Sequence, residues 1–427
     1  MQDAQSKRKK QLNRDSLLSS YKKVRAFSHK LAKPLSTEDY VVQSMPDVSP
    51  TKWHLAHTSW FFEAFVLSKS IKKYKSLHPQ YNFLFNSYYV QVGERHSRPK
   101  RGLISRPTVD EVYEYRNYVD KNMLKLFKTL DDKKFAKIAE VIEIGIHHEQ
   151  QHQELIVTDI KHVLSENPLF PVYKKSPENK KKAPKHSWID FDGGIRSIGN
   201  EGESWGYDNE FPLHNAYVEP FSLGSRLVTN GEYSEFINDD GYSKPELWLS
   251  DGWNTASSNN WIAPLYWIKD GSAWKQFSLG GLQKIDPEQP VCHLSFYEAE
   301  AFSRWAGARL PSEFEWEIAS EGRKIEGNFV DNGKFHPSAA LNANGDLSQM
   351  YGDVWEWTRS PYSPYPGYNP PPGALGEYNG KFMCNQFVLR GGSCATSKSH
   401  IRSSYRNFFP PDARWQFMGL RLAKDGK

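Results

Sequence analysis

The chain has 427 residues, which is long for one ordinary domain and suits two. Its hydrophobic content of 38% and aromatic content of 14% can fill cores, and its formal net charge of +5 is small. Much of that charge lies in two basic runs, residues 7–10 and 180–182, which lack the interleaved aromatic side chains of single-strand binders. We therefore expect no nucleic acid as a partner.

Three cysteines, Cys292, Cys384 and Cys394, are too few for a disulfide framework, which fits a reducing compartment. The N-terminus is polar and basic and lacks the apolar region of a signal peptide. No run approaches 18 apolar residues. The sequence therefore predicts a cytoplasmic protein with no membrane partner.

The first half of the chain has the pattern of a helical domain. After a basic tail at 1–13, apolar residues recur at helical spacing at 17–31, 53–67, 109–130 and 135–164. Thr108 and Glu111 have the spacing of a capping box at the start of the third segment. A long excursion at 78–107 separates the second and third segments, and loops of that length are often functional. We predict a four-helix bundle over 14–167.

The second half has a different texture. A stretch rich in proline and lysine at 168–187 indicates a linker. Beyond it, over 188–427, Gly, Trp, Asn and Pro interrupt short segments, with one clear helix at 295–306. This part predicts an irregular α+β domain.

The fourth helical segment contains His148 and His152 in an H-E-x-x-H pattern. Residues four apart on a helix lie on the same face, so both imidazoles can reach one cation. His54 or His57, in the second segment, could supply a third nitrogen from a facing helix.

Two metals fit this histidine pattern. A zinc peptidase would use Glu149 as general base and take a further ligand downstream, where Glu154 and His162 lie. A site of histidines with open positions also suits iron(II) and oxygen. The spacing alone leaves both readings open.

Longer blocks of sequence resemble a known family. The stretches at 49–63 ("SPTKWHLAHTSWFFE"), 85–108 and 147–155 resemble the DinB-like bundle of the ergothioneine-pathway sulfoxide synthases. The stretches at 310–317 ("LPSEFEWE"), 352–358, 389–393 ("LRGGS") and 405–423 resemble their formylglycine-generating-enzyme-like domain, a C-type-lectin-like fold. The resemblance therefore implies an N-terminal DinB-like four-helix bundle followed by that second domain.

The resemblance also implies a chemistry. Members of this family are mononuclear non-haem iron(II) enzymes that use O2 to join a thiol to C2 of the hercynine imidazole as a sulfoxide. Carried onto this chain, the metal ligands would be His57, His148 and His152, with His57 preferred over His54. Gln151 would orient the hercynine imidazole.

Further substrate contacts follow from the same resemblance. Asn407 would hold the trimethylammonium-carboxylate end of hercynine. Aromatic faces suit a quaternary ammonium group, and Phe408, Phe409 and Trp415 are the candidates for that wall.

The resemblance extends to the handling of oxygen and thiol. Tyr88 and Tyr89 match a tyrosine pair of the branch that accepts free cysteine, where a phenol could donate a proton or electron. An arginine can bind the carboxylate of the thiol substrate in bidentate fashion; Arg98 and Arg414 are preferred over Arg95 and Arg101.

Two departures from the family pattern refine the expectation. Phe409 stands where the branch that uses γ-glutamylcysteine has Asp, which favours free cysteine as the thiol. Cys394 follows "GGS" alone, with Cys384 ten residues earlier, whereas formylglycine-generating enzymes use a cysteine pair near that stretch. We therefore expect the second domain to shape the substrate pocket.

The sequence thus predicts an Fe(II)- and O2-dependent oxygenase that forms hercynylcysteine sulfoxide. Alternatives are the same reaction with γ-glutamylcysteine, a selenoneine-forming relative, a zinc peptidase, or a binding module without catalysis.

Overall fold

The computed structural model describes residues 13–175, 181–202, 204–341 and 346–426. The chain divides into two compact units. The first comprises Met1–Leu169 with the short segments Gly202–Trp205 and Pro370–Tyr378; the second comprises Phe170–Glu201, Gly206–Asn369 and Asn379–Lys427. The division at Leu169 falls inside the predicted linker, and the predicted tail at 1–13 lies outside the described residues except for Asn13.

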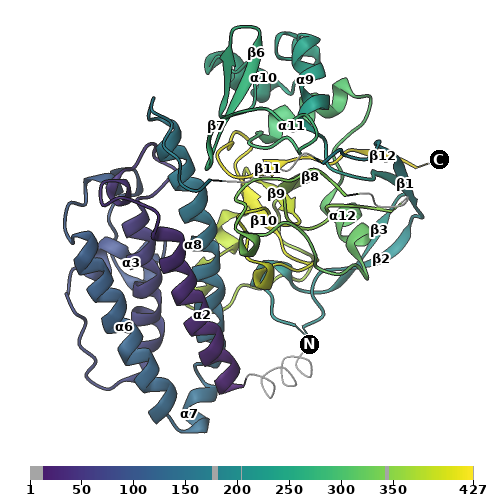
Figure 1. Cartoon of the computed structure of the whole chain (residues 1–427). Coiled ribbons are helices and arrows are strands. Elements are labelled where there is room, and N and C mark those ends of the chain that lie inside the picture. Colours follow the sequence, from purple (N-terminus) through teal and green to yellow (C-terminus); the bar gives the residue numbers. More distant parts are fainter. Residues whose placement is uncertain (1–12, 176–180, 203, 342–345, 427) are drawn as a thin grey trace. The chain divides into compact units, whose positions relative to one another are not determined.

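Four long helices of the first unit lie side by side (Figure 1), as the sequence predicts. They are α2 (Arg14–Ala32), α3 (Thr51–Phe62), α6 (Val109–Thr129) and α8 (Ala139–Ser165). Helix α3 packs against both α6 and α8, and α2 packs against α8. Short helical elements connect them: Asp39–Val41, α4 (Ser68–Ser70), α5 (Tyr81–Phe85), Val90–Val92, Arg98–Leu103 and α7 (Asp132–Ala136).

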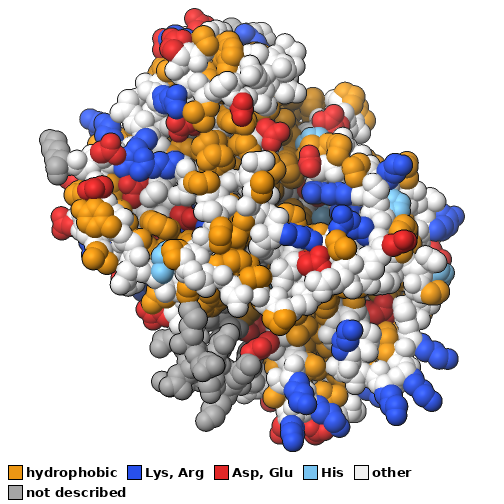
Figure 2. All heavy atoms as spheres, turned by 180° about the vertical axis from the view of Figure 1, so that it is seen from behind, with side chains coloured by type: hydrophobic (Ala, Val, Ile, Leu, Met, Phe, Trp, Pro, Cys, Tyr) orange, Lys and Arg blue, Asp and Glu red, His pale blue; other side chains and the backbone are white. Residues whose placement is uncertain are grey.

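Helix α6 illustrates why these segments are helical. The Thr108 hydroxyl accepts from the Glu111 amide and the Glu111 carboxylate accepts from the Thr108 amide, which completes the predicted capping box. One face of the helix is buried, and Lys121, Lys125 and Lys128 are exposed on the other. Figure 2 shows basic side chains projecting from the lower end of the bundle, where α6 ends and α7 lies.

Two predicted helices are interrupted. The helix predicted at 53–67 ends as an α-helix at Phe62 and continues as a π-helical turn, Glu63–Leu67. The buried Glu63 carboxylate accepts there from Tyr74, Ser76 and Tyr115 hydroxyls. The segment predicted at 135–164 is two helices, α7 and α8, which are separated at Lys137 and Ile138, where Ile138 is the N-cap of α8 with φ −115°. Neither Pro nor Gly marks that break in the sequence.

A buried carboxylate ties all four long helices together. Glu149 of α8 accepts from Arg25 Nη1 of α2 at 3.0 Å, from Arg116 Nη2 of α6 at 2.9 Å and from Ser28 Oγ at 2.6 Å. Arg25 also donates to Ser59 Oγ of α3 at 2.9 Å. Burial alone would raise the pKa of Glu149, but the two guanidinium charges outweigh it and lower the pKa to about 2.

Helices α3 and α8 also approach closely at Gly145. A Cβ atom there would lie 2.5 Å from Cε1 of Phe62. A residue without a side chain is therefore needed at this position for the two helices to pack as they do.

The second unit is built on small sheets. A four-stranded sheet has the order β10 (Asn407–Phe409), β9 (Phe387–Arg390), β8 (Trp355–Pro361), β11 (Met418–Gly419), in which β11 is parallel to β8 and the other pairs are antiparallel. A three-stranded antiparallel sheet has the order β1 (Trp188–Phe191), β4 (Phe221–Gly224), β12 (Ala423–Asp425). The remaining strands form the hairpin β2 (Gly194–Ile198)–β3 (His214–Val218) and the meander β5 (Trp267–Asp270), β6 (Ala273–Ser278), β7 (Gly281–Lys284).

Four α-helices accompany these sheets in the described part of the second unit. They are α9 (Asn230–Asn238), α10 (Ser250–Ser258), α11 (Phe296–Trp305) and α12 (Glu313–Ser320). The sequence predicted α11, but the other three are short, of eight or nine residues, and show too few periodic positions to be recognised. Buried ion pairs fix the core, including Arg421–Glu356 at 2.8 Å and Arg406–Glu313 at 2.8 Å.

No helix in the described part of the chain is both long enough and apolar enough to cross a bilayer.

Replacing Glu149 with Gln is expected to lower the free energy of unfolding by about 3–5 kcal/mol, because two buried guanidinium groups lose their counter-charge. Glu149 has its ordinary pKa of 4.5 in the unfolded chain and about 2 in the fold, so its contribution is present above pH 4.5 and is lost as pH falls toward 2. Urea unfolding at pH 7 and at pH 3.5 measures both effects.

The matched control is Glu114→Gln, at an exposed position of α6, for which we expect a change within about 0.5 kcal/mol. A loss below about 1 kcal/mol for Glu149→Gln at pH 7 would contradict the role assigned to this network.

Candidate metal centre

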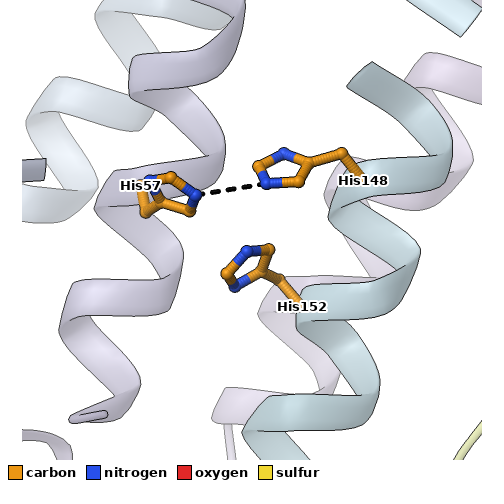
Figure 3. A group of neighbouring side chains, drawn as sticks. All are labelled: His57, His148 and His152. Atoms are coloured by element: carbon orange, nitrogen blue, oxygen red, sulfur yellow. Dashed lines mark hydrogen bonds between the residues drawn. The ribbon is translucent and has the colours of Figure 1, made fainter. Parts of the chain in front are cut away.

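Three histidines from two helices meet in the core of the bundle. His57 comes from α3, and His148 and His152 come from α8. One ring nitrogen from each lies within 4.8 Å of the others, and all three residues are buried. Figure 3 shows the three rings turned toward a common space between the two helices.

The helices bring these rings together for simple reasons of spacing. His148 and His152 are one turn apart, so their rings lie on the face of α8 that packs on α3. The rings of Trp53 and Trp60, a turn before and after His57 on α3, stack against it at 4.5 and 5.4 Å. The aromatic packing holds the His57 ring in one orientation.

The nitrogen geometry fits a bound transition metal. His57 Nε2 and His148 Nε2 are 3.1 Å apart. A metal holds imidazole nitrogens at about 2.0–2.1 Å, so two neighbouring ligands at a right angle are roughly 3 Å apart. His57 Nδ1 donates to the Phe85 carbonyl at 2.5 Å, which leaves its Nε2 with a lone pair for a metal.

Burial keeps the three rings neutral. It lowers the pKa of His148 to about 3, and burial together with the neighbouring imidazoles lowers the pKa values of His57 and His152 well below 6.5. Neutral imidazole is the form that binds a cation, so the site is ready for metal at neutral pH.

His54 lies beside the cluster and is not one of its three members. Its Nδ1 is 2.8 Å from His152 Nδ1, and its Nε2 is 3.0 Å from Asp159 Oδ2. Both of its nitrogens therefore face other side chains of the protein, consistent with the sequence preference for His57 over His54.

The zinc-peptidase reading of the H-E-x-x-H pattern is wrong for this chain. Both carboxylate oxygens of Glu149 accept from Arg25, Arg116 and Ser28, so the carboxylate is engaged in these bonds and does not fit the role of general base. His162, the downstream ligand considered for a peptidase, contacts Ser44 Oγ instead, and neither it nor Glu154 belongs to the histidine cluster.

The structure adds a tyrosine that sequence reasoning missed. Tyr378 is buried in the first unit, donates its hydroxyl hydrogen to Gln151 Oε1, and places its ring 5.8 Å from that of His148. It lies in a stretch rich in Pro and Gly more than 200 residues from α8, and no local motif marks it.

The rings of the two predicted tyrosines lie close together. The rings of Tyr88 and Tyr89 are 4.7 Å apart, so they do not point to opposite sides as in an extended strand. The backbone turns there, with the Val90 amide donating to the Tyr88 carbonyl. Tyr89 is fully buried against Trp60 and Phe65, and the Tyr88 ring meets that of Tyr378 edge-on at 6.1 Å.

The predicted arginines occupy different surroundings. Arg98 is exposed. Arg101 is buried, and its guanidinium lies 3.3 Å above the ring of Trp53, which stacks on His57. In the second unit, Arg414 is paired with Glu298 at 2.7 Å and stacks on Trp261.

The other predicted hercynine contacts lie in the second unit. Asn407, Phe408 and Phe409 form strand β10. The ring of Phe408 stacks on Tyr362 at 4.0 Å, and the ring of Phe409 meets that of Trp415 edge-on at 5.6 Å. The cysteines Cys292, Cys384 and Cys394 are free thiols, so Cys384 and Cys394 form no disulfide.

Both halves of the chain match models of known protein families. Residues 20–156 match the model of the DinB superfamily, and residues 173–426 match that of the sulfatase-modifying factor enzyme 1-like domain. A hercynine oxygenase of Mycolicibacterium smegmatis is 33% identical over 90% of this chain and 92% of its own length. A hercynine oxygenase of Mycolicibacterium thermoresistibile is 32% identical over 89% and 88%. A formylglycine-generating enzyme of Streptomyces coelicolor is 28% identical over 55% of this chain and 87% of its own length.

Replacing His57, His148 or His152 singly with Ala is expected to weaken Co(II) binding by at least roughly 100-fold, because loss of an outer-shell partner alone costs about 10- to 100-fold. Equilibrium dialysis of the full chain measures the dissociation constant. His162→Ala, on the same helix outside the cluster, should bind Co(II) like the unaltered protein. Unchanged Co(II) binding by any of the three cluster variants would remove that residue from the ligand set.

Proposed function

The chain belongs to the hercynine oxygenase family, and we propose that it is an iron(II)- and O2-dependent sulfoxide synthase that joins cysteine to hercynine. The cluster of three buried, neutral histidines in the DinB-like bundle carries this proposal. The overall reaction balances when hercynine C2–H, the thiol S–H and O2 give one C–S bond with an S=O group and one water.

The donor set suits iron in this reaction. Three neutral imidazoles leave the full positive charge of the cation uncompensated, so anionic thiolate and neutral imidazole substrates can both bind at open positions. Bound iron(II) would supply activation of O2 beside the two substrates. His57, His148 and His152 would hold the metal.

Gln151 and Tyr378 are proposed to orient hercynine. Gln151 directly precedes the proposed ligand His152 on α8. The side-chain oxygen of Gln151 accepts from the Tyr378 hydroxyl. With its oxygen accepting from Tyr378, Gln151 has its NH2 group as the donor proposed to bond to an imidazole nitrogen of the substrate. Asn407, Phe408, Phe409 and Trp415 remain proposed contacts for the quaternary ammonium end, where aromatic faces are suited to a cation with no N–H group.

Tyr88 and Tyr378 are the proposed proton donors. Tyr378 contacts the ring of His148, and Tyr88 contacts Tyr378. Tyr89, the second member of the predicted pair, supports them by packing beneath Tyr88. Glu377 steadies this arrangement, because its carboxylate accepts from the Val90 and Gln91 amides, both at 3.0 Å, just after the tyrosine pair.

Arg101 is the arginine best placed to bind the carboxylate of the thiol substrate. Among the described residues it has no ion-pair partner, its Nε has no hydrogen-bond partner, and it contacts the histidine cluster through Trp53. A buried guanidinium without an ion-pair partner gains most from an incoming anion. Arg98 remains a proposal on the same loop, and the Glu298 partner of Arg414 makes that residue the weaker candidate.

Cysteine is proposed as the thiol because Phe409 stands where an Asp is expected for γ-glutamylcysteine. The protein reconstituted with Fe(II) under nitrogen should form hercynylcysteine sulfoxide when hercynine, cysteine and air are supplied. We expect kcat/KM for cysteine to exceed that for γ-glutamylcysteine by about tenfold or more, which is about 1.4 kcal/mol. Mass spectrometry and oxygen uptake measure product and rate.

Three controls accompany this assay: omission of iron, omission of O2, and a selenosugar in place of cysteine. If neither cysteine nor γ-glutamylcysteine gave sulfoxide, the proposed reaction would be refuted. A preference for γ-glutamylcysteine or for the selenosugar would keep the family chemistry and replace the proposed donor.

Replacing Tyr378 with Phe is expected to slow sulfoxide formation by about 100-fold, because a positioned general acid contributes about 10²–10⁴-fold. Iron content and oxygen uptake should persist, with oxidised cysteine replacing the sulfoxide as product. Tyr113→Phe is the matched control, since the Tyr113 hydroxyl bonds to that of Tyr40 at 2.9 Å and Tyr113 contacts none of the three histidines of the cluster. An unchanged product ratio for Tyr378→Phe would exclude Tyr378 from proton transfer.

A further inference from the structure

We propose that His54 and Asp159 form a positioning pair that fixes the ring of His152, so that His152 presents Nε2 to the metal. This inference rests on the metal site proposed above. The pair forms a chain of side chains: Asp159 Oδ2 to His54 Nε2 at 3.0 Å, then His54 Nδ1 to His152 Nδ1 at 2.8 Å. All three residues are buried.

The positions of the hydrogen atoms in this series of hydrogen bonds follow from the bonds at Asp159. The Ser49 amide can only donate, and it donates to Asp159 Oδ2 at 2.9 Å, so this oxygen is an acceptor. A carboxylate has no hydrogen to donate, so it also accepts from His54 Nε2–H. A ring with one hydrogen, placed on Nε2, has a bare Nδ1. The hydrogen between the two Nδ1 atoms then belongs to His152, and the lone pair of His152 lies on Nε2.

Asp159 also fixes where His54 stands. The bond from the Ser49 amide anchors the chain just before α3 to α8, and His54 follows in the first turn of α3. The same carboxylate thus sets the start of one helix and orients a ring on it. A change at Asp159 would be transmitted to His152 through His54.

The three ligands differ in how their second nitrogen is held. His57 Nδ1 donates to a backbone carbonyl, that of Phe85, which substitution of a side chain cannot remove. His148 Nδ1 is buried with no hydrogen-bond partner among the described residues. His152 depends on a side-chain partner, and carboxylate–histidine partners of this kind orient a ligand and raise its basicity. The orientation of the His152 ring can therefore be tested by replacing its side-chain partner.

The test uses the full chain without substrate. His54→Leu removes the acceptor for His152 Nδ1–H, and we expect Co(II) binding to weaken by about 10- to 100-fold. In His54→Asn the side-chain oxygen can take the place of His54 Nδ1, and we expect affinity to recover to within about threefold of the unaltered protein. His162→Leu is the control, a histidine on α8 that lies outside the cluster and should leave affinity unchanged.

A second readout requires no variant. Long-range ¹⁵N–¹H NMR of the histidine-labelled protein loaded with diamagnetic Zn(II) distinguishes the two ring nitrogens. We expect His152 to carry hydrogen on Nδ1 and metal on Nε2. Metal on Nδ1 of His152, or a dissociation constant for His54→Leu within twofold of the unaltered protein, would overturn the proposal.

If His54→Leu does not fold, the NMR assignment on the unaltered protein decides alone. Both readouts are taken without hercynine or thiol. An enzyme that formed no sulfoxide would therefore refute the proposed function and leave this inference to stand or fall by itself.

Discussion

The buried Glu149 carboxylate is the interaction on which the histidine cluster depends. It lies next to His148 on α8 and binds guanidinium groups from α2 and α6, while Arg25 reaches on to α3. An uncompensated charge in this core would cost several kcal/mol, so the four helices are held at the one register that satisfies it. That register places the histidine face of α8 against His57.

The charged network and the histidine cluster divide the core between them. On one side of α8 the charges are fully compensated by partners, and on the other the imidazoles are neutral because burial disfavours their protonation. A cation entering the neutral side meets lone pairs rather than carboxylates. The H-E-x-x-H pattern therefore has two functions here: its histidines are proposed to hold metal, while its glutamate holds the fold.

Much of the fold could be predicted from sequence because its determinants are local. The amphipathic period of α6 and its capping box at Thr108 are readable from neighbouring residues, as is the spacing of His148 and His152. The break between α7 and α8 carried no Pro or Gly, and the short helices α9, α10 and α12 had too few turns to show a period. These were missed because tertiary packing, rather than local preference, determines them.

The site was predictable only as far as motifs reach. His57 was chosen over His54 by resemblance, but the reason, that both nitrogens of His54 face His152 and Asp159, depends on a contact across about 100 residues. Tyr378 and Glu377 join the first unit from far along the chain, which no spacing rule anticipates. The Glu298 partner of Arg414 was likewise invisible in the sequence.

Iron K-edge X-ray absorption of the Fe(II)-loaded protein, before and after anaerobic addition of cysteine and hercynine, reports whether imidazoles and the substrate sulfur lie at the metal. We expect outer-shell scattering from three imidazoles in the loaded protein and a new iron–sulfur scatterer once cysteine and hercynine are present. Scattering from carboxylate ligands in place of imidazoles, or no sulfur at iron with both substrates bound, would contradict this expectation.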